Sequence, residues 1–398
     1  MGCICMYTPS ASGGHALYTW ELMTALTLHA DAANRFELVT SENLAPEFKE
    51  ASYPVHTILP PLSHRREFST NIAWATSRVL HYPVRELTFL RWLKGRPDIT
   101  GVHFQEYKPW LAGPLFRRLR RDGKKIFYTV HNIRPHEYPP GIPKPLMDHW
   151  THSSWHACDG LFVHTPRLAE ELATLLGKDH PPIHVSPHGT WTVHKPVEIP
   201  AIEERLKWKR LLFFGTIRRN KGLDVLLDAM ELLPGYSLTI AGESHGSDYY
   251  RDQIVPQIDR LRARGIPIEL LHHFTPDDQV GPLFGRHSAI VLPYTHKFVA
   301  QSGVAFLSLA HEVPVIASEV GGLRDLFSED EIGATFGEVT PTGLAAAVRG
   351  FFERKPGHEI VRQMRAARDH YSWSAAAEAT IAGYATPREA VAPVGAAR

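Results

Sequence analysis

Short apolar runs alternate with helix-length amphipathic stretches along most of the 398-residue chain. The first repeat of this pattern is clear. Residues 2–7 have the character of a buried strand, residues 8–15 contain two adjacent glycines, and residues 16–28 have helical periodicity. Repeated strand–loop–helix units are typical of parallel sheets covered by helices on both faces. The sequence therefore predicts an α/β fold.

The alternation occurs in two series, separated by an irregular stretch at residues 191–208 that contains Pro196 and Pro200 and is predicted to be a linker. The first series predicts further strands at residues 36–40, 55–58, 101–104, 125–129, 160–164 and 183–186 and a helix at 166–176. The second predicts strands at residues 211–215, 236–241, 268–272, 288–292 and 314–318 and helices at 223–233, 253–264, 277–286, 303–310 and 344–353. We therefore expect two doubly wound Rossmann-like domains, each binding ligand at the carboxyl ends of its strands, that face each other across a cleft.

Composition excludes several classes of protein. Lys and Arg total 43 and Asp and Glu total 42, so the net charge of +1 argues against a nucleic-acid partner. The three cysteines are too few for a disulfide framework and favour a cytoplasmic location. No apolar run reaches the roughly 18 residues of a membrane span, and the amino terminus lacks the basic region of a signal peptide. The 24 histidines show no metal-ligand spacing, so no metal site is expected.

The strongest chemical motif runs from Phe213 to Gly222. An apolar strand leads into a loop that carries Arg218, Arg219 and Lys221, and a helix follows. Lysine offers a point charge and arginine a planar fork, so cations at the carboxyl end of a parallel strand suit a diphosphate. A solvated, charged turn is the alternative interpretation.

A second motif, Gln301-Ser302-Gly303-Val304, follows the predicted strand at residues 288–292. Ser302 can cap a helix over residues 303–310, and the unpaired N–H groups at such a helix start bind anions without a charged side chain. An ordinary capped helix is the alternative. Because both motifs lie at strand-to-helix junctions of one domain and both favour phosphate, together they indicate a phosphate site.

Two features of the first series are less specific. Gly13 and Gly14 would allow a ligand close to the backbone, although the loop lacks GxGxxG spacing and could be a simple tight turn. Histidines stand at or just after predicted strand ends, where they could bind sugar hydroxyls or phosphate or transfer protons, or could be structural. These histidines are His103, His131, His136 and His188.

A basic run lies beside apolar residues Trp110, Leu111, Leu115 and Phe116. Such a segment could rest on an anionic membrane surface, and a solvated helix end is the alternative. The run comprises Arg117, Arg118, Arg120, Arg121, Lys124 and Lys125.

The order and spacing of these motifs resemble family 4 of the nucleotide-sugar-dependent glycosyltransferases, which have the GT-B fold, over nearly the whole chain. The matching segments are Ser12-Gly13-Gly14-His15, Val130-His131-Asn132, Ser186-Pro187-His188-Gly189, Gly215 to Gly222, and Pro314 to Ser318 with Gly321-Gly322-Leu323. The segments around Ile217–Leu223, Leu292–Tyr294 and Gln301–Gly303 are similar to a subgroup that acts in polysaccharide or glycolipid assembly.

The resemblance implies transfer of a hexose from a nucleoside diphosphate sugar, with UDP or GDP as the nucleotide, to a hydroxyl of a lipid-linked or saccharide acceptor. It implies neither a metal nor a separate cofactor, and a cytoplasmic enzyme that can associate with the inner membrane face. His131 would lie at the transferred sugar, while Arg218 and Lys221 would stabilise the leaving diphosphate. The remaining donor contacts would be Gly13, Gly14, Gly215, Gln301, Ser302, Gly303 and Val304.

The resemblance also implies a division of labour along the chain. Residues 1–190 would form the acceptor-side domain and residues 209–370 the donor-binding domain. Residues 371–385, anchored by Trp373, would form a helix that crosses back to the first domain, and the Ala/Pro-rich residues 386–398 would be a disordered tail.

Four positions depart from the family pattern. Val299 and Leu307 occupy the places of two glutamates that usually contact the donor, and Glu312 replaces a glycine. The usual Gly-Arg pair reads Gly215-Thr216, so Arg218 would supply the phosphate arginine. These departures leave the stereochemical outcome open between the family's retention and inversion. They also leave two alternatives, a nucleotide-sugar epimerase and a degenerate member that binds nucleotide or glycan without transfer.

Overall fold

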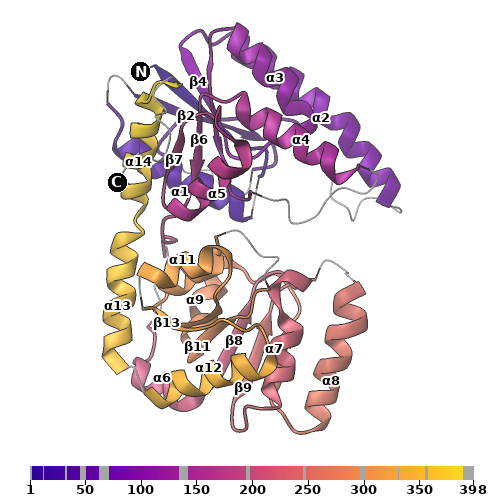
Figure 1. Ribbon diagram of the computed structural model, residues 1–398, viewed down its shortest axis with the longest axis vertical. Coiled ribbons are helices and arrows are strands. Elements are labelled where there is room, and N and C mark those ends of the chain that lie inside the picture. Colours follow the sequence, from indigo (N-terminus) through magenta and orange to yellow (C-terminus); the bar gives the residue numbers. More distant parts are fainter. Residues whose placement is uncertain are drawn as a thin grey trace. The chain divides into compact units, whose positions relative to one another are not determined.

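The computed structural model describes residues 2–11, 13–31, 34–44, 51–61, 71–133, 142–193, 198–244, 248–295, 301–329, 331–354 and 357–388. The chain divides into two compact units (Figure 1). Unit 1 comprises Met1–Gly189 and Trp373–Arg398, and unit 2 comprises Thr190–Ser372. Within the described residues, no helix is both long and apolar enough to cross a bilayer.

Unit 1 contains a seven-stranded parallel sheet in the order β3-β2-β1-β4-β5-β6-β7. The strands are β1 (Cys3–Tyr7), β2 (Arg35–Ser41), β3 (Val55–Leu59), β4 (Ile99–Phe104), β5 (Lys125–Thr129), β6 (Gly160–Val163) and β7 (Ile183–Val185). The helices are α1 (Gly14–Leu28), α2 (Asn71–Lys94), α3 (Pro109–Arg121), α4 (Lys144–His156), α5 (Pro166–Leu176) and α14 (Trp373–Ala385).

Helices cover unit 1 on both faces of the sheet, as the alternating sequence predicts. Cys3, Cys5 and Tyr7 alternate along β1 and share one buried core with apolar side chains of α2, α3, α4 and α5. Helix α14 packs against α1 and contacts β6 and β7 (Figure 1). It also reaches the core, because the Tyr384 hydroxyl lies 2.6 Å from Nδ1 of the fully buried His103.

Unit 2 contains a six-stranded parallel sheet in the order β10-β9-β8-β11-β12-β13. Its strands are β8 (Arg210–Phe214), β9 (Ser237–Ala241), β10 (Ile268–Leu271), β11 (Ala289–Leu292), β12 (Val315–Ser318) and β13 (Gly333–Phe336). The helices are α6 (Ile202–Trp208), α7 (Leu223–Met230), α8 (Val255–Ala263), α9 (Asp277–Gly285), α10 (Gly303–Ala310), α11 (Gly321–Glu329), α12 (Pro341–Arg354) and α13 (Gly357–His370), with short turns η3 (Arg219–Lys221) and η4 (Tyr250–Ile254).

Two expectations need correction. The stretch at 191–208 is not simply a linker, because its last seven residues form α6 and the buried Arg205 of that helix donates from Nη2 to Glu312 O at 2.8 Å. The tail predicted to be disordered from residue 386 is ordered in its first residues, since Arg388 Nη2 donates to His156 O at 2.9 Å. Residues 389–398 lie outside the described residues.

In each sheet the strand order reverses at one place, between β1 and β4 in unit 1 and between β8 and β11 in unit 2. Loops that leave neighbouring strands at such a switch point diverge to opposite faces, which opens a crevice for ligands at the carboxyl edge. The sites are therefore expected in the loops after these four strands.

Candidate active site

In unit 2 the loop after β8 is held tightly against the segment that follows β11. Gly222 has φ +64°, and a Cβ atom there would lie 1.9 Å from Pro293 O, so glycine is required. The Thr295 N–H donates to Asn220 O at 3.0 Å. The two loops of the switch point thus form one rigid wall.

The cations of this loop point to different partners. Arg219 donates from Nη1 to Gln253 Oε1 at 3.1 Å, and its guanidinium lies 4.8 Å from the Tyr249 ring centroid. Arg218 is exposed as Arg219 is, but among the described residues no such hydrogen bond or ring contact holds it. The structure therefore presents Arg218, rather than Arg219, as the arginine that can reach a ligand.

Lys221 lies deeper in the same wall. Its Nζ atom is 3.7 Å from the ring centroid of Tyr294, which is completely buried. Burial lowers the pKa of Lys221 to about 7, and the charge of Arg218 acts in the same direction. A diphosphate at this place would reverse that shift, because an anion stabilises the protonated amine.

The first turn of α10 completes the wall. The buried Ser302 caps the helix, with Oγ accepting from the Ala305 N–H at 3.4 Å, and the Tyr294 hydroxyl lies 3.2 Å from the same Oγ. A Cβ atom at Gly215 would lie 3.5 Å from Val304 Cγ2, so the β8 loop and this helix start are adjacent. The structure thus brings Gly215, Lys221, Ser302 and Val304 together, with Gly303 between the last two.

Gln301 precedes this turn and lies against α11. A Cβ atom at Gly322 would be 2.7 Å from Gln301 Cδ, and Gln301 Oε1 is buried with no hydrogen-bond partner among the residues that the structure describes. Of the two positions that usually hold glutamates, Leu307 is a partly exposed residue of α10, and Val299 lies outside the described residues.

The replacement of the family's glycine by Glu312 has a structural counterpart. Glu312 has φ +50°, the left-handed conformation that glycine adopts most easily. Its carboxylate is held by a two-point ion pair from Arg365, at 2.7 and 2.9 Å. Glu312 therefore has the left-handed backbone conformation expected of a glycine, and Arg365 holds its side chain in place.

In unit 1 a cluster of rings surrounds His131, just after β5. Its ring centroid is 4.8 Å from those of both His15 and Tyr18 on α1. Gly13 has φ +80°, and among the described residues nothing lies within 4 Å of a Cβ atom at either Gly13 or Gly14, so the backbone is open at the start of α1. The predicted Gly13, Gly14 and His131 thus belong to one site, while Ser12 lies outside the described residues.

Hydrogen bonds fix the proton positions in this cluster. His164 Nδ1 is 3.1 Å from Ser186 O and must donate to it, so His164 Nε2 accepts from His131 Nδ1 at 3.0 Å. Burial lowers the pKa of His131 well below its usual range and that of His164 to about 4, so both rings are neutral. His131 Nε2 is then the acceptor nitrogen, 3.2 Å from the side-chain amide of Gln105.

The other predicted histidines have structural partners. His103 lies between the Tyr384 and Thr129 hydroxyls, at 2.6 and 2.8 Å, and burial lowers its pKa to about 3. His188 Nδ1 donates to Gly189 O at 2.7 Å. His136 lies outside the described residues. The sequence did not reveal His164, Gln105 or Tyr294 as site residues, although Tyr294 stands in a motif whose spacing marks a strand end.

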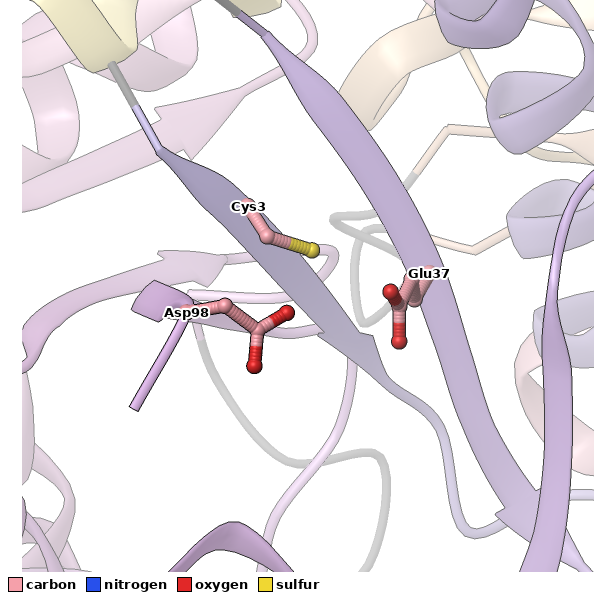
Figure 2. Close-up of side chains that lie close together, drawn as sticks. All are labelled: Cys3, Glu37 and Asp98. Atoms are coloured by element: carbon pink, nitrogen blue, oxygen red, sulfur yellow. The ribbon is translucent and has the colours of Figure 1, made fainter. Parts of the chain in front are cut away.

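One cluster has the spacing of a metal site, formed by Cys3, Glu37 and Asp98 (Figure 2). Arg96 donates to Glu37 at 2.7 Å and to both oxygens of Asp98 at 3.0 and 2.8 Å, and His56 also binds Glu37. Burial, with the Glu37 charge, raises the pKa of the Cys3 thiol to about 12. The carboxylates are thus paired with cations and the thiol is protonated. The cluster lies at the amino ends of β1 and β2, away from the ligand-binding edge.

Comparison with known proteins shows which family the chain resembles. Residues 12–192 match the family model of Glycosyltransferase Family 4, and residues 208–354 match that of Glycosyl transferases group 1. D-inositol 3-phosphate glycosyltransferase of Xylanimonas cellulosilytica is 30% identical over 94% of this chain and 92% of its own length. Glycogen synthase of Mycobacterium tuberculosis is 25% identical over 95% and 92%. GDP-mannose:glycolipid 4-beta-D-mannosyltransferase of Xanthomonas campestris is 25% identical over 56% and 62%.

Solved structures share the architecture at low sequence identity. Sucrose-phosphate synthase of Thermosynechococcus elongatus superposes with a TM-score of 0.72 at 17% identity, covering 96% of this chain and 98% of its own. Anabaena Alr3699/HepE, in complex with UDP and glucose, gives 0.70 at 13% identity, covering 97% and 100%. Sequence and architecture together show that the chain belongs to the family 4 glycosyltransferases and has their GT-B fold.

Proposed function

We propose that this glycosyltransferase moves a hexose from a nucleoside diphosphate sugar to a hydroxyl of a saccharide or glycolipid, without a metal ion. The observation that carries the proposal is the convergence of Arg218, Lys221 and the capped first turn of α10 at the unit 2 switch point. These groups suit a diphosphate. The Xanthomonas relative named for a GDP-mannose donor and the Anabaena structure with UDP support this donor class.

The proposed mechanism is mainly electrostatic. As the bond between the sugar's anomeric carbon and the diphosphate oxygen breaks, negative charge develops on the leaving diphosphate. Lys221, Arg218 and the N–H groups of residues 303 and 304 stabilise this charge, in the role that a divalent cation has in metal-dependent enzymes. The hexose passes to the acceptor oxygen, and the proton of that hydroxyl is taken up by the diphosphate oxygen that leaves. In this scheme the transferred sugar lies at His131, and a sugar hydroxyl takes the place of the Gln105 amide beside Nε2.

A pocket at the unit 1 switch point supports a saccharide acceptor. It encloses about 530 Å³ of empty space, its open mouth included. Tyrosine rings suit the C–H faces of a sugar, and carboxylates suit its hydroxyls. The Tyr107 hydroxyl donates to Glu86, and Arg85 Nη2 donates to Pro9 O at 2.9 Å, so the polar groups are held in place. The lining residues are Tyr7, Pro9, Ser10, Tyr82, Arg85, Glu86, Glu106, Tyr107, Lys108 and Leu111.

A lipid-linked acceptor would place α3 at a membrane surface. Arg117 and Arg121 of this helix are exposed, and so is Lys125. Lys124 is excluded from such a contact, because its Nζ donates to the carbonyl oxygens of Arg96 and Ile99. Retention on vesicles with 30% anionic lipid at low salt, and release at high salt, would support this contact; no retention at low salt would exclude it.

The proposal is tested by following donor consumption with and without acceptor, in EDTA. Thermal unfolding in the presence of nucleotides is measured first, since a ligand at 100 times its dissociation constant stabilises the folded protein by about 2.7 kcal/mol. Selective stabilisation by one nucleotide, with acceptor-dependent consumption in EDTA, is the expected result. Consumption of donor to an altered free sugar without acceptor would indicate the epimerase, and stabilisation without turnover the degenerate binder.

A further inference from the structure

Tyr294 contacts both halves of the proposed donor site. Its ring faces the Lys221 ammonium group, and its hydroxyl lies 3.2 Å from the Ser302 Oγ that caps α10. We propose that Tyr294 is a positioning residue that holds the Lys221 ammonium group in place for the donor diphosphate and ties it to the first turn of α10. This inference rests on the proposed function and assigns a role to a residue that the sequence did not reveal as a site residue.

The backbone around Tyr294 makes it a fixed support. Ser318 Oγ donates to Tyr294 O at 2.6 Å, which joins the end of β11 to the end of β12. On the other side, Thr295 N–H donates to Asn220 O, and Pro293 O packs against Gly222. The residues before and after Tyr294 therefore both contact the loop that carries Lys221, so the ring and the ammonium group have a fixed relation.

The charges near Lys221 explain why such a support is needed. Arg218 on the same loop repels it, and burial also disfavours its charge. Asp224, on the following helix, is engaged with the Tyr249 hydroxyl at 2.8 Å and with Gln253 at 3.2 Å. The Tyr294 ring is neutral, because burial raises the pKa of its hydroxyl, and Ser302 does not titrate. The face of the buried Tyr294 ring favours the charged form of Lys221.

The hydroxyl and the ring have separable roles. The ring supports the ammonium group, while the hydroxyl connects to the helix cap. Tyr294→Phe removes only the second contact, so we expect donor affinity within about threefold of wild type. Tyr294→Leu removes both. We expect it to weaken nucleotide binding about tenfold at pH 8. The pH above which nucleotide affinity falls should be about one unit lower, which corresponds to the loss of a desolvated cation–π contact.

Unit 2 offers a matched control. Tyr236 is also buried, and Lys209 Nζ lies 5.1 Å from its ring centroid, but this pair is outside the site. Tyr236→Leu should reduce stability without changing nucleotide affinity or the pH dependence of binding. If Tyr294→Leu and Tyr236→Leu have the same effects, Tyr294 is a structural residue and the inference is wrong.

Folding failure of Tyr294→Leu would not end the test. Fluorinated phenylalanines at position 294 have nearly the shape of the phenylalanine in Tyr294→Phe, but each added fluorine reduces the negative potential at the face of the ring. We expect the titration midpoint of isotope-labelled Lys221, followed by NMR without nucleotide, to fall with each added fluorine; an unchanged midpoint overturns the inference. Because this readout needs no nucleotide, it is separate from the proposed function, which fails if wild-type protein binds no nucleotide at all.

Discussion

Mild acid should destabilise unit 1. His103, His164 and His188 are buried, and burial lowers their pKa values to about 3, 4 and 3. In the unfolded chain a histidine has a pKa near 6.5. Below pH 6.5 these histidines therefore bind protons in the unfolded state but not in the folded state, so the free energy of unfolding falls as the pH falls.

The size of the effect follows from proton linkage. Between pH 7.5 and pH 5.5 each of these histidines removes about 1.3 to 1.4 kcal/mol, or about 4 kcal/mol for the three. Glu86 acts in the opposite direction, because burial raises its pKa to about 7 and its folded form binds a proton in this window. Since Glu86 is partly exposed, we discount its contribution to about 1 kcal/mol. The expected net loss is about 3 kcal/mol, a large part of a typical total stability.

Urea unfolding followed by tryptophan fluorescence measures this loss, since most of the nine tryptophans lie in unit 1. His103→Gln is the sharpest variant, because glutamine can still bond to Tyr384 and Thr129 but does not titrate. Its stability should depend on pH less than that of wild type, by about 1.4 kcal/mol over the same window. Equal stability of wild type at the two pH values, or an unchanged pH dependence in His103→Gln, would refute the reasoning.

Four further outcomes are expected. Lys221→Ala should lower transfer by at least about 100-fold, as loss of an oxyanion donor does, and wild-type turnover would remove Lys221 from the mechanism. Arg218→Ala should reduce kcat more than Arg219→Ala, because Arg219 is bound to Gln253; the reverse order in steady-state kinetics would show the wrong arginine was chosen. Above pH 7, donor binding should take up a proton at Lys221, seen by calorimetry in buffers of different ionisation enthalpy. The free energy of unfolding should be about 1 kcal/mol lower for Glu312→Ala than for Glu312→Gly, because only alanine strains the left-handed backbone. Equal urea midpoints of the two variants would mean that there is no strain.

Much of the architecture could be predicted because buried parallel strands are short apolar runs with sharp ends. Twelve of the thirteen strands that the structure describes, the glycine loop at Gly13 and the charged loop before Gly222 were visible in this way, whereas β13 was missed. Helix α2 was missed, since its mean hydropathy is close to neutral and Pro83 interrupts it, and α6 was hidden among prolines. Local periodicity does not show what tertiary packing will stabilise.

The loops that form the site could be predicted from the sequence, but the contacts between their side chains could not. Spacing placed Lys221 and Ser302 at strand ends of one domain, but the link between them is Tyr294, whose ring reaches Lys221 through folding rather than sequence proximity. In the same way, His131 stood out at a strand end, while the partner that fixes its proton, His164, follows a different strand. Contacts across a sheet edge depend on strand order, which a sequence pattern does not give.

The position of α14 has a consequence for synthesis on the ribosome. Unit 1 holds Tyr384 in its core and has Trp373 in the place that a side chain at Gly189 would fill. The first 189 residues emerge long before these two side chains exist, by about 10 to 40 s at ordinary translation rates. Unit 2, although encoded second, can be completed first. Until these two side chains are made, the places that they fill in unit 1 stay open, so this unit is completed only when α14 has been synthesised.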